Sequence, residues 1–330
     1  MTTTTWARRL AVIGSTVALG LGLSTAAFGS GNSSTVSISD EYGVAWNCQF
    51  NPYSAADQFA SFGPVYEELV YMDSLKNGAT TPWLASAWAW SNGNKTLTFT
   101  IRSGVKWSDG TAFSAKDVIY SFDLLKKYPA LDLNGDWSVL SSVSAKGSNQ
   151  VVFQFTKPSV TYFYYIADET PIVPQHIWSK IKNPVTYLDA APIGTGPYTM
   201  HTCSSANIQY TKNANYWQPG KPYIETVNFP SYLSNNAANA DLASGVDQWG
   251  SQYIPNIKAY YLSKNPDYHI WFEPTYNVNI YINLKNSILS NLAVRQAMAY
   301  AIDRSAVSKI GESGYEPASN QTSIVKPTYS

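Results

Sequence analysis

The sequence predicts a mixed fold of β-strands and α-helices, of the α/β or α+β class. Between Thr96 and Ile101 apolar residues alternate with threonines, which is the two-residue period of a half-buried strand. Ser114 stands three residues before Asp117, a variant of the capping box that opens a helix. Because strands and helices follow one another without a regular βαβ repeat, we expect lobes of mixed structure rather than a barrel.

Further elements follow from local patterns along the chain. The first strand is expected at 36–38, and Asn51-Pro52 closes that region in a turn. A helix is expected over 59–69, a strand over 151–155, and a short helix around 176–178. Residues 292–310 are expected to form one long helix, because their apolar residues recur at helical spacing.

The N-terminus has the pattern of an export signal. Arg8 and Arg9 precede an apolar run over 10–23, and small residues follow it. We therefore expect residues 1–29 to be a signal peptide. The run is short and rich in glycine for a membrane-spanning helix, although an uncleaved anchor is the alternative. No cysteine lies at the end of the run, so a lipid anchor is not expected.

Composition argues against several classes of function. The formal net charge is zero, so nothing draws the chain broadly toward nucleic acid or anionic lipid. Charged residues make up 13% and aromatic residues 14% of the chain. We expect most of these aromatic side chains to build cores, and a minority to line a ligand cleft.

The two cysteines, Cys48 and Cys203, are a candidate disulfide if the protein is exported. Two buried thiols are the alternative. The three histidines show no ligand spacing around the cysteines, so no metal site is expected.

Motifs for catalysis and for cofactor binding are missing from the sequence. There is no Gly-x-Ser-x-Gly elbow and no Walker A loop. The Gly194-Thr-Gly196 segment runs into Pro197, which does not suit a phosphate cradle at a helix N-terminus. We therefore expect neither an enzyme nor a cofactor.

The identities of the residues around 101–118 are more informative than the secondary structure predicted for this segment. It contains Ile-Arg, Gly-Val-Lys-Trp, Asp-Gly, Phe-x-Ala and Asp-Val at the spacing of a known signature. Six further matches follow the same family order, at 67–69, 82–88, 194–198, 213–217, 244–247 and 294–304. The chain resembles the extracytoplasmic solute-binding proteins of family 5, which deliver peptides and other solutes to ABC importers. It departs from their pattern at Ala112, where the family has Pro, at Glu68, where it has Gly, and at 244–247, which is one residue short.

The resemblance implies a periplasmic-binding-protein-like fold of type II, with two lobes around a cleft and an inserted domain. Residues 30–69 and 179–275 correspond to the two segments of lobe I, and residues 70–178 to the inserted domain that carries the signature. Residues 276–330 correspond to the start of lobe II. Because the family's second lobe is much longer, we expect this C-terminal lobe to be incomplete, from a fragment or a truncated frame.

By family position, three segments supply candidate ligand-binding residues. Trp249 is expected to stack on a ligand, whereas Gln252, Asn277 and Asn279 are expected to form hydrogen bonds to it. Ordinary packing or a turn role is the alternative for each. The full candidate set is Asp57, Gln58, Phe59, Trp249, Ser251, Gln252, Tyr276, Asn277 and Asn279.

The function implied is the substrate-binding component of an ABC importer, which captures oligopeptides or dipeptides by hinge closure. Its expected partners are the solute and the importer's permease subunits, with no nucleic acid, and we expect a monomer. Three alternatives remain: a receptor for oligosaccharides, a receptor for another solute, or an extracellular sensory or structural protein without a transport role. Among other solutes, nickel chelates are disfavoured because the chain has few histidines.

Overall fold

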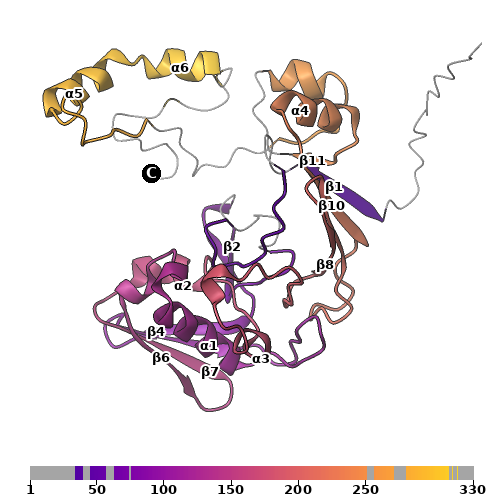
Figure 1. The fold of residues 1–330 in the computed structure, drawn as a ribbon, viewed down its shortest axis with the longest axis vertical. Helices are drawn as coiled ribbons and strands as arrows, with labels where there is room; N and C mark the ends of the chain where they lie inside the picture. The colour runs from indigo at the N-terminus through magenta and orange to yellow at the C-terminus, as the bar shows by residue number, and fades with distance from the viewer. Residues whose placement is uncertain are drawn as a thin grey trace, which may run out of the picture. The chain divides into compact units, whose positions relative to one another are not determined.

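The computed structural model describes residues 34–39, 45–56, 63–73, 76–250, 256–270 and 280–311, together with Gly314 and Ala318 (Figure 1). The predicted signal peptide over 1–29 lies outside these residues. Within them the fold mixes helices and sheets, as predicted. No helix in this part of the chain is long and apolar enough to cross a membrane.

A five-stranded sheet has the order β11-β1-β10-β9-β8. β1 pairs in parallel with β10 on one side and with β11 on the other, whereas β10, β9 and β8 pair antiparallel. Helix α4 (Asn235–Ser244) carries the chain from β10 to β11, with β1 between these two strands. The bounds are β1 Thr35–Ser39, β8 Tyr198–Cys203, β9 Asn207–Lys212, β10 Thr226–Pro230 and β11 Trp249–Gly250.

A four-stranded antiparallel sheet has the order β4-β5-β7-β6. Helix α1 (Ala115–Lys127) packs against β6 and β7, and the Phe122 ring meets the Phe153 ring edge-on at 4.8 Å between centroids. The strand predicted over 96–101 and the capping box at Ser114 are both confirmed. The bounds are β4 Ala85–Ser91, β5 Thr96–Ile101, β6 Leu140–Lys146 and β7 Gln150–Phe155.

The remaining elements are short. β2 (Val70–Asp73) and β3 (Ala79–Pro82) form an antiparallel pair. The other α-helices are α2 Phe163–Ala167, α3 Gln175–Trp178, α5 Leu292–Ala301 and α6 Arg304–Gly311. The 3₁₀ and π helices are η3 Pro129–Leu131, η4 Asp136–Ser138, η5 Val160–Tyr162, η6 Pro184–Thr186 and η7 Lys258–Leu262.

The helix predicted over 59–69 is wrong for its described part, 63–69, which is turn and extended chain. The backbone here bonds to a distant segment, because Gly196 N–H donates to Val65 O at 2.9 Å and Tyr198 N–H donates to Pro64 O at 2.9 Å. Apolar periodicity alone does not reveal such partners.

The single helix predicted over 292–310 is two helices instead. Ile302 has an extended backbone at ψ 110°, which ends α5. The Asp303 carboxylate then accepts a hydrogen bond from Ala306 N–H at 2.9 Å, as an N-cap does at a helix start.

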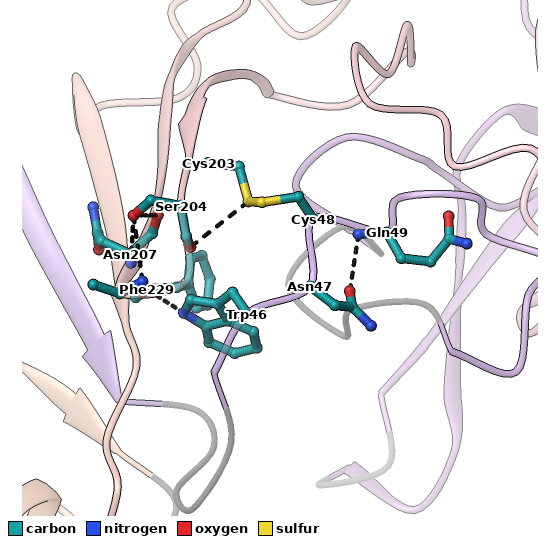
Figure 2. The surroundings of a disulfide bond; sticks show 9 residues. Trp46, Asn47, Cys48, Gln49, Cys203, Ser204, Asn207 and Phe229 are labelled. Atoms are coloured by element: carbon teal, nitrogen blue, oxygen red, sulfur yellow. Dashed lines mark hydrogen bonds between the residues drawn. A yellow bond between two sulfur atoms is a disulfide. The ribbon is translucent and has the colours of Figure 1, made fainter.

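A disulfide between Cys48 and Cys203 joins the segment after β1 to the last residue of β8 (Figure 2). Trp46, two residues before Cys48, donates its indole N–H to Phe229 O in β10 at 2.7 Å. The disulfide and this hydrogen bond fix the chain that leaves β1 to the antiparallel part of the same sheet.

Candidate functional site

Three parallel strands of the five-stranded sheet end at one edge. β1 ends at Ser39, β11 at Gly250 and β10 at Pro230, and Ser39 is paired with Gly250. In open sheets with parallel strands, ligands commonly bind beyond the carboxyl ends of the strands. We call this region, with Tyr232 and the 245–249 segment, the carboxyl edge (Figure 1).

A buried carboxylate holds the carboxyl edge together. The Asp247 side chain accepts a hydrogen bond from Ser37 Oγ at 2.7 Å and another from the Tyr232 hydroxyl at 2.6 Å. Asp247 is 1% exposed; its bond to Tyr232 is buried and its bond to Ser37 is partly buried. These three residues come from β1, from the chain after β10 and from the chain before β11, so Asp247 connects all three parallel strands.

Tyr232 also donates to the Asp241 carboxylate at 2.9 Å, so one phenol O–H lies between two carboxylates. Burial, followed by the hydrogen bonds to Asp247 and Asp241, raises the pKa of Tyr232 far above its ordinary value. The phenol therefore stays protonated and keeps its donor role at physiological pH.

Gln248 forms a second connection between this segment and β1. Its side-chain oxygen accepts from Ser37 N–H at 2.8 Å, and its backbone N–H donates to Ser37 O at 2.9 Å. Its amide nitrogen donates back to Gly245 O at 2.9 Å, which braces the turn after α4. That turn begins at Gly245, whose φ of 82° is a left-handed helix C-cap that favours glycine.

Trp249 is the residue that these connections position. It lies in β11 opposite Ile38 of β1, and its side chain is 61% exposed despite its size. An indole that is held in register beside β1 and is largely exposed is a suitable stacking surface for a ligand. The geometry thus provides one aromatic platform at the carboxyl edge.

The sequence profile of the bacterial extracellular solute-binding proteins, family 5 middle region, matches residues 79–330. The chain belongs to this family. The strands and turns described above are therefore those of a family 5 solute-binding protein.

Individual relatives agree with this membership. The glutathione-binding protein of Escherichia coli K12 is 28% identical over 293 residues, which cover 84% of this chain and 54% of that protein. The nickel-binding periplasmic protein of Escherichia coli K12 is 28% identical over 288 residues, which cover 81% and 52%. A periplasmic oligopeptide-binding protein from Thermotoga maritima superposes with a TM-score of 0.78 at 28% identity, over 89% of this chain and 56% of that one.

This family 5 chain spans about half the length of the curated relatives it matches. Of the candidate ligand-binding residues, Trp249 is described by the structure. The others lie outside the described residues: Asp57, Gln58, Phe59, Ser251, Gln252, Tyr276, Asn277 and Asn279. The structure therefore describes Trp249 alone among the candidates, and the ligand-binding role of all nine residues stays a prediction.

Three residues that position Trp249 were not predicted from the sequence, namely Asp247, Tyr232 and Ser37. Asp247 ends the family motif at 244–247, which was a usable signal for its importance. Tyr232 and Ser37 carry no motif, and Ser37 lies 210 residues from Asp247 along the chain. Among the described residues no group of three or more His, Cys, Asp or Glu side chains is placed to hold a metal ion.

Proposed function

We propose that this protein is the extracytoplasmic solute-binding component of an ABC importer, and that it captures oligopeptides or dipeptides. Membership of family 5 supports the receptor role. The observation that carries the proposal is the exposed Trp249 indole, held by the Asp247 and Gln248 connections at the carboxyl edge. The permease subunits of the importer are the partners in this proposal.

Two similarities favour peptides as the solute. The Thermotoga maritima relative is named as an oligopeptide-binding protein, and an Escherichia coli relative binds glutathione, itself a tripeptide. A peptide offers backbone amides to fixed polar groups and a variable side chain to an aromatic surface. We propose that Trp249 contacts a side chain, and that Gln252, Asn277 and Asn279 bond to the peptide backbone.

An oligosaccharide is the second candidate. The Thermotoga maritima oligopeptide-binding protein has also been crystallised with mannohexaose bound. That structure is 28% identical to this chain and superposes on it with a TM-score of 0.76. An exposed indole stacks on sugar rings as well as on peptide side chains. Trp249 therefore has the same role in either case, and only its ligand differs.

The proposed division into lobes accompanies this function. The four-stranded sheet with α1 lies within the proposed inserted domain over 70–178, and β8 to β11 lie within the second lobe I segment over 179–275. Residues 276–330 begin lobe II in this proposal. The signal peptide over 1–29 and export from the cytoplasm belong to it as well.

The test is to purify the protein from its own host, denature it and identify the released molecules by mass spectrometry. A mixed set of short peptides would support the peptide proposal, and released oligosaccharides would support the second candidate. A protein that releases nothing, and that binds neither a library of di- to pentapeptides nor manno-oligosaccharides in a later titration, would contradict the receptor role.

A further inference from the structure

A concave surface separate from the carboxyl edge lies where the end of β5 meets the segment between β9 and β10. It is an open depression of about 760 Å³, a volume that accommodates a small molecule. Its polar lining consists chiefly of Ser86, Arg102, Ser103, Asn149, Gln218 and Lys221. We call it the Arg102 groove.

The Arg102 groove carries positive charge without a balancing acid. Arg102 and Lys221 are among its lining residues, and no Asp or Glu is. Within the part of the chain that the structure describes, neither cation takes part in an ion pair. The groove therefore presents two cationic side chains to any anion that enters it.

Arg102 is held by neutral groups instead of carboxylates. Its Nε donates to Trp83 O at 2.6 Å and its Nη2 to Pro82 O at 3.1 Å. Its guanidinium lies over the Trp217 ring, 4.5 Å from the ring centroid. Because a guanidinium has five N–H donors, three of them have no acceptor among the described residues.

The buried side chain of Glu67 holds the wall behind Arg102 in place. Glu67, which is 1% exposed, accepts from the Trp217 indole N–H at 3.0 Å and from the Trp83 indole N–H at 2.8 Å. The Tyr216 hydroxyl donates to the same carboxyl group at 3.2 Å. Arg102 thus rests on a ring and on a backbone segment that are themselves fixed, as a preorganised site requires.

Lys221 is the second cationic residue of the lining. Its ammonium lies 3.8 Å from the Tyr223 ring centroid, a cation–π contact that orders the side chain. A guanidinium and an ammonium in one groove suit a phosphate or carboxylate group.

We propose that the Arg102 groove binds a small hydroxylated anion of the sugar phosphate or sugar acid class. The anionic group takes the free donors of Arg102 and the ammonium of Lys221. The hydroxyl groups of the ligand bond to the amides of Asn149 and Gln218 and to the hydroxyls of Ser86 and Ser103. This site does not depend on the solute bound at the carboxyl edge.

The test uses glucose 6-phosphate and glucuronate as probes, and uncharged glucose as their comparison, in calorimetric titrations of the full chain. Both anions are expected to bind saturably at low salt and more weakly at high salt, whereas glucose does not bind. Lys221→Gln is expected to weaken binding about tenfold, because a charge-assisted contact is lost. Lys157→Gln removes an exposed lysine outside the groove and is expected to change nothing.

Three results would contradict the proposed anion site. They are the absence of saturable binding by either anion, binding of glucose as tight as that of the anions, and unchanged anion binding in Lys221→Gln. Trp249→Ala is expected to retain anion binding while it binds solute at the carboxyl edge more weakly. A protein that binds neither peptide nor oligosaccharide but keeps anion binding would contradict the proposed function and leave the Arg102 groove supported.

Discussion

At the scale of single residues, Asp247 does more to shape the carboxyl edge than the exposed residue that it positions. A buried carboxylate is tolerated only where hydrogen bonds replace the water it has lost. Ser37 and Tyr232 supply those bonds here. The side chain is therefore structural, and its loss should disturb the place of Trp249 as well as the free energy of unfolding.

We expect Asp247→Ala to lower the free energy of unfolding by about 1–3 kcal/mol, because the Ser37 and Tyr232 hydroxyls lose a buried acceptor. Urea denaturation measures this, and hydrogen exchange should show faster exchange in β1 and β11. Asp241→Ala is the matched control, since Asp241 is less buried and Tyr232 keeps Asp247 as an acceptor. An equal loss of unfolding free energy in the two variants would contradict the structural role given to Asp247.

Several buried carboxyls make stability depend on pH. Burial raises the pKa of Glu67 and of Asp136 to about 7, and that of Asp168 and Asp189 to about 6. Because these values exceed the ordinary ones of 3.8 to 4.5, the folded state holds protons that the unfolded state releases. Their stabilising contribution is complete below about pH 4 and is lost as the pH rises toward 7.

We therefore expect the free energy of unfolding to fall between pH 5 and pH 7.5, measured by urea denaturation. Asp136→Asn should flatten part of this dependence, because the Asp136 Oδ1 atom is buried without a hydrogen bond and the amide carries no charge. Lys157→Gln serves as the control and should leave the slope unchanged. Stability that rises over this interval would show that the carboxyls are not held in their protonated form.

At the scale of elements, the features predicted correctly are those with local causes. The alternation over 96–101 and the Ser114 cap act within a few residues, so the sequence alone reveals β5 and the start of α1. In the segment 63–69, Pro64, Val65 and Glu67 bond through their backbone to residues more than 100 positions away, and the helix predicted there is wrong. The carboxyl edge follows the same rule. Trp249 was proposed from the resemblance and stays a prediction as a ligand contact, whereas the Asp247 bonds to Ser37 and Tyr232 depend on the β10-α4-β11 crossover.

The backbone of Pro64 and Val65 lies so close to Gly194 and Gly196 that neither position has room for a side chain. A Cβ at Gly194 would lie 1.8 Å from Val65 O, and one at Gly196 would lie 2.4 Å from Pro64 O. Both neighbours are backbone atoms, which cannot move aside as a side-chain tip does. The close approach allows Gly196 N–H to donate to Val65 O and closes this part of the core.

We expect Gly194→Ala to be severely destabilising, by about 3 kcal/mol or more, because overpacking is combined with the loss of backbone bonds. Thermal denaturation of the purified variant measures the change. Gly311→Ala is the matched control: it lies at the end of α6 with nothing within 4 Å of its added Cβ, and it should be neutral. A Gly194→Ala protein with the wild-type melting temperature would contradict the close packing.

At the scale of the whole molecule, the disulfide and the parallel strands both link distant parts of the chain within one sheet. The Cys48–Cys203 bond spans 155 residues of sequence and ties the chain leaving β1 to β8 of the same sheet. The candidate solute residues at 57–59 follow that chain. The bond thus ties the chain that leaves β1 to β8, while the Asp247 connections tie β1, the chain after β10 and the chain before β11 together.

Replacing both cysteines by serine should lower the free energy of unfolding by about 2–5 kcal/mol, because the unfolded chain regains the entropy of a long loop. Urea denaturation of the oxidised protein and of the double variant measures the difference. Wild-type protein treated with a reductant should match the variant. An unchanged midpoint would mean that the bond contributes nothing to stability.

The most direct test of the central claim is native mass spectrometry of the protein with a library of di- to pentapeptides, comparing wild type, Trp249→Ala and Tyr165→Ala. Tyr165 is an exposed aromatic residue of α2, outside the carboxyl edge and the Arg102 groove, and serves as the control. We predict that Trp249→Ala lowers peptide affinity about tenfold while Tyr165→Ala binds as wild type does. Peptide bound equally by all three proteins would contradict a solute site at the carboxyl edge.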